Sequence, residues 1–293
     1  MGSEPKVYLD YTQAELDRAY DQRAWAANAD EVIASYGTES AKARAEFAHT
    51  ANIAYGPTPE ETLDLFLPLA RGSRPAPVHV HVHGGGWRNL TKDEESFLVR
   101  CFAPAGAMLA VLNFATIPKV RIPEMMAQAR RAIAWLHANV ARLGGDPDNI
   151  HVSGHSSGGH MAGVLTATDW AAHRLPADVI KSGLLVSGMY DLRPVMLSAR
   201  SSYVTLSPAE VDELSAILHI DRVRAPLVLA WGSLETPEFQ RQPQAYADAL
   251  EAAGKKVTRL VVPGQNHFEI LRLLGDAGSP LGRAALGLMG LAR

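Results

Sequence analysis

Near the middle of the chain runs the stretch Ile150-His151-Val152-Ser153-Gly154-His155-Ser156-Ser157-Gly158. Its β-branched residues predict a short strand over 150–153, and the small residues of 157–167 predict a helix directly after it. Between strand and helix, the pattern Gly-x-Ser-x-Gly places Ser156 at a sharp turn, where the glycines leave room for a residue in strained geometry. We therefore expect Ser156 to be a nucleophile at the N-terminus of a helix. A packing turn of small residues is the alternative interpretation.

Strands and helices alternate on both sides of this stretch. Further strands are expected over 63–67, 78–82, 108–114, 183–186, 226–231 and 256–262, and further helices over 122–143, 239–253 and 268–274. This alternation predicts an α/β fold with a mostly parallel central sheet flanked by helices. Ligands bind such sheets at the carboxyl ends of the strands, which is where the main candidate residues fall.

The first fifty residues have a different pattern. Residues 12–34 and 41–50 have helical spacing but only thin apolar stripes, so they cannot fold alone. We expect residues 1–293 to form a single domain, in which 1–50 is an N-terminal helical segment that acts as a partial cap.

The composition excludes several classes of protein. The chain has 293 residues, 47% of them hydrophobic, and a formal net charge of −3. It is therefore too apolar to be disordered, and it lacks the basic surface that nucleic acid or an anionic membrane requires. One cysteine, Cys101, excludes a disulfide framework. No apolar run reaches the roughly 20 residues of a membrane helix, and residues 1–10 lack the apolar core of a signal peptide. A cytoplasmic location is expected, and a homodimer is left open.

A glycine-rich loop follows the strand expected over 78–82, with the sequence His83-Gly84-Gly85-Gly86-Trp87. Glycines allow backbone N–H groups to point into a site without obstruction. Together with the N–H of Ser157, these groups are candidate donors to the oxyanion of an acyl-transfer reaction. A flexible glycine loop is the alternative. A phosphate loop is excluded because no Gly-Lys-Ser/Thr follows.

A nucleophilic serine needs a base and an acid later in the chain. His267, in Asn266-His267-Phe268, follows the last strand and is the expected base. Two carboxylates, Glu235 and Glu238, follow the strand over 226–231. Glu235 is favoured because it lies nearer the strand, whereas Glu238 begins a helix and has a capping role available. Asp191, after the preceding strand, remains a further candidate for the acid.

Other residues have weaker signals. Three aromatic residues are candidates for the walls of a substrate pocket, with core packing as the alternative: Trp87, Phe114 and Tyr190. His79, His81 and His83 alternate along one strand at a spacing that could hold a metal. No second cluster of ligands completes such a site, so neither a metal nor another cofactor is expected.

Four stretches together resemble the kynurenine formamidases (arylformamidases) of the α/β-hydrolase fold, near the hormone-sensitive-lipase-like esterases. They are HGGGW at 83–87, GHSSGGHMAG at 154–163, PEFQRQ at 237–242 and NHF at 266–268. The resemblance covers nearly the whole chain. It implies a serine hydrolase in which Ser156 is the nucleophile, Glu235 the acid and His267 the base.

The resemblance also implies oxyanion donors at Gly84, Gly85 and Ser157, and it favours an N-formyl amide as substrate. Members of the family usually have tyrosine where Gly86 stands, alanine at Ser157 and more often aspartate at Glu235. The open position at Gly86 favours the alternative function, a carboxylesterase for small acyl esters. A binding module of the same fold without catalytic activity is a third hypothesis, which the intact serine, acid and histidine disfavour.

Overall fold

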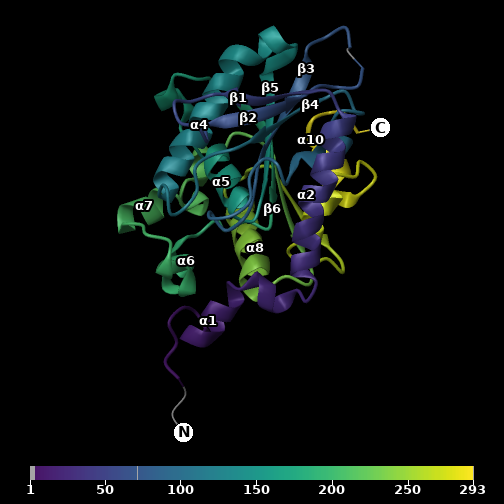
Figure 1. Cartoon of the computed structure of the whole chain (residues 1–293). Helices are drawn as coiled ribbons and strands as arrows, with labels where there is room; N and C mark the ends of the chain where they lie inside the picture. The colour runs from purple at the N-terminus through teal and green to yellow at the C-terminus, as the bar shows by residue number, and fades with distance from the viewer. Residues whose placement is uncertain (1–3, 71, 293) are drawn as a thin grey trace.

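The computed structural model describes residues 4–70 and 72–292, and its core is one eight-stranded sheet in the order β1-β2-β4-β3-β5-β6-β7-β8 (Figure 1). The strands are β1 (His49–Ala54), β2 (Thr62–Phe66), β3 (Ala76–Val82), β4 (Met108–Leu112), β5 (Gly145–His155), β6 (Ile180–Val186), β7 (Leu227–Gly232) and β8 (Val257–Val262). From β4 to β8 the neighbouring strands are parallel, and β1 and β2 add an antiparallel edge. The predicted α/β fold with a mostly parallel sheet is confirmed.

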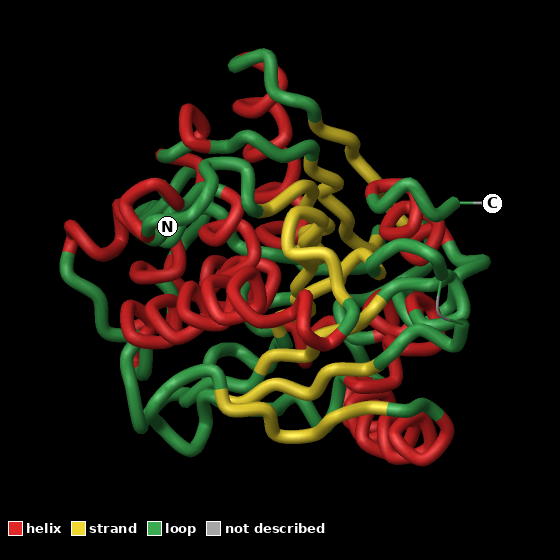
Figure 2. Tube along the Cα trace, turned by 90° about the horizontal axis from the view of Figure 1, so that it is seen from above, coloured by secondary structure: helices red, strands yellow, loops and turns green. Residues whose placement is uncertain are grey.

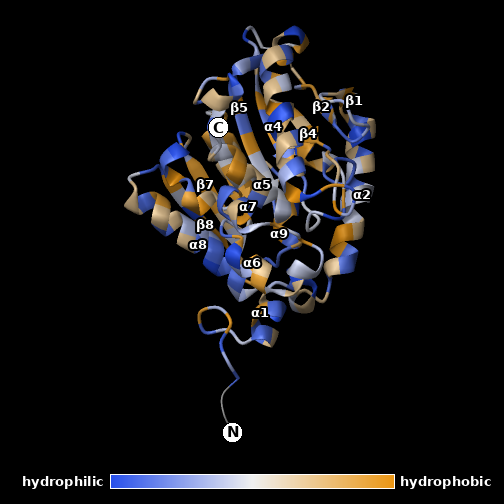
Figure 3. Cartoon of the chain, turned by 90° about the vertical axis from the view of Figure 1, so that its left-hand side faces the viewer, coloured by the Kyte–Doolittle hydropathy of each residue, from blue (hydrophilic) through white to orange (hydrophobic). Residues whose placement is uncertain are grey.

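Helices cover both faces of the sheet (Figure 2). One face is covered by α4 (Ile122–Asn139), α5 (Ser157–Thr166) and α8 (Pro237–Ala252), and the other by α2 (Ala29–Glu46), α3 (Val99–Phe102), α9 (Glu269–Leu273) and α10 (Pro280–Leu288). Because side chains alternate along a strand, Ala110 of β4 packs in the apolar cluster under α4, α5 and α8. Its neighbours Leu109 and Val111 pack in the cluster on the other face, under α2, α3, α9 and α10. The central strands are correspondingly hydrophobic (Figure 3).

The N-terminal segment differs from its prediction. Residues 12–34 form two pieces, α1 (Gln13–Ala19) and a short 3-10 turn, before α2 begins at Ala29. The side chain of Thr12 caps α1 in a reciprocal box with Glu15. The helix predicted over 41–50 is wrong beyond Glu46, because residues 49–54 form the edge strand β1. Pairing with β2 stabilises this strand, whose side chains are mostly exposed and show little apolar pattern.

The turn between β5 and α5 has the geometry that its sequence predicts. Ser156 has φ 57° and ψ −120°, which is strained for a residue with a side chain. A Cβ on Gly154 would lie 2.1 Å from the carbonyl oxygen of Gly158, and one on Gly158 would lie 2.0 Å from that of Val82. Only glycine therefore permits the backbone contacts that fix this turn.

We predict that Gly158→Ala lowers the free energy of unfolding by about 3 kcal/mol or more, because the added Cβ would overlap backbone atoms of Val82 and His83, which cannot shift without distorting the sheet. Gly37→Ala is the matched control: Gly37 lies within α2 and has no neighbour within 4 Å of an added Cβ. This control is expected to raise stability by about 0.5–1 kcal/mol. Denaturant unfolding followed by circular dichroism measures both, and equal effects of the two variants would contradict the packing argument.

Candidate active site

Three side chains from the carboxyl ends of the strands form one hydrogen-bonded chain. Ser156 follows β5, Glu235 follows β7, and His267 lies between β8 and α9. The Nε2 atom of His267 lies 2.8 Å from Oγ of Ser156, and its Nδ1 lies 2.7 Å from Oε2 of Glu235. A carboxylate accepts only, so Nδ1 carries the proton and Nε2 is free to accept one from the serine. The structure thus brings the predicted nucleophile, base and acid together.

The three carboxylates considered from sequence have different partners. Glu235 is buried and also accepts hydrogen bonds from the backbone N–H of Gly232 (2.7 Å) and the hydroxyl of Ser187 (2.6 Å). Glu238 instead accepts from the hydroxyl of Tyr20 and pairs with Arg241. Asp191 pairs with Arg193. Only Glu235, of these three, contacts His267.

Burial shifts the pKa values of both members of the acid–base pair. It raises the pKa of Glu235 to about 7, against the opposing effects of its hydrogen bonds to Gly232 and Ser187. It lowers the pKa of His267 to about 3, and the nearby charge of Arg200 acts in the same direction. At neutral pH His267 is therefore an uncharged imidazole, the form that a general base requires.

The loop that carries His267 is held from two sides. His155 donates from Nε2 to the backbone carbonyl of His267 at 2.7 Å, and burial lowers the pKa of His155 to about 3. From the N-terminal segment, the hydroxyl of Tyr36 donates to the carbonyl of Phe268. Asn28 accepts from Nδ2 of Asn266 at 2.8 Å. The position of the base thus depends on contacts made far away in the sequence.

The hydrogen bonds of the glycine loop correct the predicted set of oxyanion donors. The N–H of Gly84, a predicted oxyanion donor, is donated to Oε1 of Glu95 at 3.0 Å and is therefore engaged. Within the described residues, the N–H groups of Gly85, Gly86 and Ser157 have no hydrogen-bond acceptor. Gly85 and Gly86 line a cavity together with Ser156. The free donors of the glycine loop are thus Gly85 and Gly86, one residue further along than the Gly84 and Gly85 that the family resemblance implies, whereas Ser157 belongs to both sets.

Glu95 is a fully buried carboxylate beneath this loop. Its Oε2 atom lies 2.6 Å from Nε2 of His81, whose Nδ1 lies 2.7 Å from the hydroxyl of Ser153. Burial raises the pKa of Glu95, but the hydrogen bond to His81 and the electrostatic effects of His81, His83 and His155 together outweigh burial and leave the pKa below its usual value. Glu95 is thus an ionised acceptor that fixes the N–H of Gly84.

The two histidines of β3 and His83, the residue directly after this strand, have partners within the protein. His79 lies 2.6 Å from the hydroxyl of Ser153, which it shares with His81, and His83 stacks on Phe114. Across residues 4–70 and 72–292, no group of three His, Cys, Asp or Glu side chains is placed to hold a metal ion.

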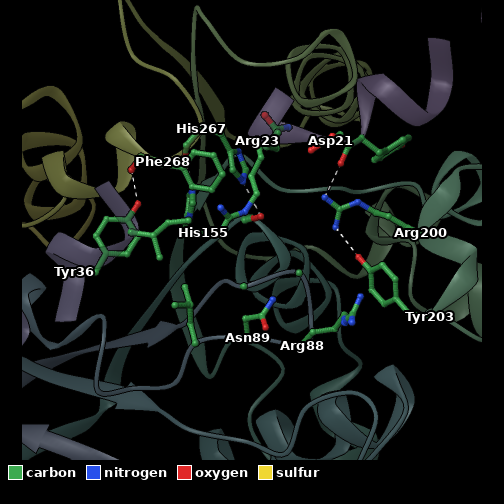
Figure 4. Close-up of a pocket in the computed structure, with 17 residues that line it drawn as sticks. Asp21, Arg23, Tyr36, Arg88, Asn89, His155, Arg200, Tyr203, His267 and Phe268 are labelled. Carbon is green, nitrogen blue, oxygen red and sulfur yellow. Dashed lines mark hydrogen bonds between the residues drawn. The ribbon is translucent and has the colours of Figure 1, made fainter. Parts of the chain in front are cut away.

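A cavity of about 330 Å³ opens above Ser156 (Figure 4). Its lining comes from the N-terminal segment, the glycine loop, the serine turn, the 200–203 segment and the His267 loop: Tyr20, Asp21, Gln22, Arg23, Ile33, Tyr36, Gly85, Gly86, Arg88, Asn89, Leu90, His155, Ser156, Arg200, Tyr203, His267 and Phe268.

The aromatic residues proposed from sequence as pocket walls do not line this cavity. Phe114 is buried against His83, and Tyr190 is stacked on Tyr246 at 4.7 Å between ring centroids. Trp87 is buried with its edge against His160. All three belong to the core, which corrects the prediction. The aromatic lining comes from Tyr20, Tyr36, Tyr203 and Phe268.

Several residues that build the site carry no signal in the sequence. Ser187 and Glu95 act on Glu235 and Gly84 from other loops, and Arg200 reaches the cavity from a segment without regular pattern. His155, by contrast, occupies the first variable position of Gly-x-Ser-x-Gly. Because it directly precedes the nucleophilic serine, the sequence alone indicates that it lies near the site.

Comparison with known proteins identifies the family of the chain. The BD-FAE family matches residues 63–182. A kynurenine formamidase from Salmo salar is 30% identical over 97% of this chain and 98% of its own length. The chain belongs to the kynurenine formamidase family. Among esterases, LipC from Mycobacterium tuberculosis is 27% identical over 77% of this chain and 61% of LipC.

The fold of this family member also agrees with solved structures. A putative thioesterase from Silicibacter sp. TM1040 superposes with a TM-score of 0.79 and 25% identity, covering 93% of this chain and 99% of that protein. The α/β-hydrolase fold is thereby shown. None of the helices that the structure describes combines the length and apolar character needed to span a bilayer.

The pKa of Glu235 predicts the acid limb of activity. Because burial raises this pKa to about 7, the carboxylate is protonated below that pH and no longer accepts the Nδ1 proton of His267. We expect kcat/KM to fall as the pH decreases through about 7, measured from about pH 5 to pH 9. Ser187→Ala removes a donor to the carboxylate and should move the limb to higher pH. A flat profile down to about pH 5 would contradict this account.

Glu95 is predicted to act as a positioning residue. Glu95→Gln keeps the side-chain shape but turns a charged acceptor into a weaker neutral one, so the glycine loop is held less well. We expect kcat to fall about 10- to 100-fold with little change in KM, since the donors serve the transition state. Steady-state kinetics on the folded variant measures this, and a change confined to KM would argue against the role.

Proposed function

We propose that this chain is a serine hydrolase that cleaves small N-formyl amides through an acyl-enzyme on Ser156. The observation that carries the proposal is the buried chain Glu235–His267–Ser156, with its serine facing a cavity beside free backbone N–H groups. The kynurenine formamidase from Salmo salar, which matches along nearly its whole length, supports the formyl group as the acyl part.

In the first half of the reaction, Oγ of Ser156 attacks the formyl carbon while Nε2 of His267 takes its proton. The carbonyl oxygen becomes negative and is stabilised by the N–H groups of Gly85, Gly86 and Ser157. The C–N bond then breaks, and His267 returns the proton to the leaving amine. Glu235 holds the imidazole in the correct tautomer and stabilises its charged form throughout.

In the second half, water attacks the formyl ester with His267 again as base. The ester bond to Oγ breaks, formate leaves, and the serine regains its proton. No redox change occurs, and all atoms are supplied by substrate and water. The N-terminal residues Tyr20 to Arg23 lie over the cavity and limit the size of the amine that fits.

One observation favours a second candidate, a carboxylesterase for short acyl esters. Gly86 has no side chain, and the atoms nearest to an added Cβ are Nη1 of Arg200 at 3.6 Å and the hydroxyl of Tyr203 at 3.7 Å. One further carbon therefore fits beside the oxyanion donors at ordinary van der Waals distance, which supports an acyl group one carbon larger than formyl.

A substrate panel with the Ser156→Ala variant tests the proposal. The wild type is expected to cleave formanilides with higher kcat/KM than p-nitrophenyl acetate or butyrate. Ser156→Ala should lose about 10⁵-fold of either activity while keeping its circular dichroism spectrum, because the other groups have no nucleophile to activate. Faster turnover of the esters would favour the second candidate, and unchanged activity of the variant would refute both.

A further inference from the structure

The cavity above Ser156 carries an excess of positive charge. Its charged lining residues are Arg23, Arg88, Arg200 and a single carboxylate, Asp21. Arg23 is paired with Asp30 outside the cavity. Across the part of the chain that the structure describes, neither Arg88 nor Arg200 has a carboxylate within 4.0 Å. Two guanidinium groups therefore face the cavity without a counter-ion.

Arg200 is held in place by neutral groups. Its Nη1 donates to the hydroxyl of Tyr203 at 3.1 Å, and its Nη2 donates to the backbone carbonyl of Tyr20 at 2.9 Å (Figure 4). A guanidinium has five N–H donors on three nitrogens. In Arg200, Nη1 and Nη2 donate to the described residues, whereas Nε has no hydrogen-bond partner among them. The side chain is thus positioned while part of its donor capacity is unused.

Aromatic rings surround this guanidinium. Its central carbon lies 5.8 Å from the ring centroids of Trp87 and Phe239 and 5.9 Å from that of Tyr20. Ring faces stabilise a cation without neutralising it. They also displace water, so attraction to an incoming anion is stronger here than at an open surface.

Arg88 extends the same patch. Its guanidinium carbon lies 4.5 Å from the ring centroid of Tyr203, the residue that also accepts from Arg200. Nη1 of Arg200 would lie 3.6 Å from a Cβ on Gly86, beside the reacting groups, and Arg88 lines the same cavity. A substrate bound at Ser156 therefore places its outer part against these two cations.

We propose that Arg200, assisted by Arg88, forms a carboxylate-binding subsite that selects substrates with a negative charge on the leaving group. A carboxylate matches the planar donor fork of arginine, and Asp21 at the same cavity disfavours dianions. The effect on turnover rests on the proposed hydrolase function, whereas the binding of the anion does not. Arg200 is on this view a determinant of specificity in addition to a structural contact of the N-terminal segment.

A matched pair of amides tests this proposal: 3-formamidobenzoate and 3-formamidobenzamide share the scissile bond and the shape but differ in charge. We expect the wild type to prefer the benzoate in kcat/KM by about 10- to 100-fold, the range of a hydrogen-bonded charge. Arg200→Gln should abolish this preference, and Arg88→Gln should reduce it about threefold to tenfold. Arg200→Lys should retain part of it, because the charge remains but the fork is lost.

The control is Arg142→Gln, an exposed arginine that does not line the cavity, which should leave the ratio of the two rates unchanged. A purely structural role of Arg200 would lower both rates equally in Arg200→Gln and leave the ratio intact, which would overturn the proposal. The ratio is informative even if the variant is less stable, because both substrates meet the same folded fraction.

Binding to the Ser156→Ala variant separates this inference from the proposed function. Calorimetric titration with 3-formamidobenzoate should show binding that weakens about 10-fold or more when Arg200→Gln is added. Such binding without any turnover by the wild type would keep the subsite and refute the hydrolase function. Equal turnover of both amides would keep the function and refute the subsite. Tighter binding of inorganic phosphate than of the benzoate would also refute the carboxylate assignment.

Discussion

The site depends on one backbone conformation, the positive φ of Ser156 between β5 and α5. This turn is possible because Gly154 and Gly158 let the strands β3 and β5 and the helix α5 approach to backbone contact. It directs the hydroxyl toward the cavity and places the N–H of Ser157 beside it. The strain is confined to this turn. The central sheet, which is packed with apolar residues on both faces, supplies the stability that offsets it.

Two buried carboxylates then fix the loops around this turn. Glu235 holds His267 and is itself held by Gly232 and Ser187. Glu95 holds the glycine loop through Gly84. Each is buried, so an unmade hydrogen bond would cost far more than at the surface. Such satisfied polar contacts give the site its rigidity and keep the remaining N–H groups free for the reaction.

The sequence predicts what local patterns determine. Alternating strands and helices predict the sheet, and Gly-x-Ser-x-Gly predicts the turn at Ser156. Contacts between distant segments leave no such pattern. Pairing with β2 makes residues 49–54 a strand despite their polar character, Glu95 takes the N–H of Gly84 from another loop, and packing puts Trp87 into the core instead of the pocket. The cavity likewise takes its positive charge from Arg88 and Arg200, which belong to no motif.

The central claim is that His267, held by Glu235, activates Ser156 as a nucleophile. Labelling with a fluorophosphonate, followed by peptide mass spectrometry, tests it most directly. The account predicts one adduct per chain, located on Ser156, and a labelling rate that falls about 10³-fold or more in His267→Ala, because the serine loses its base. An adduct on another residue, or equal labelling rates of the wild type and His267→Ala, would contradict it.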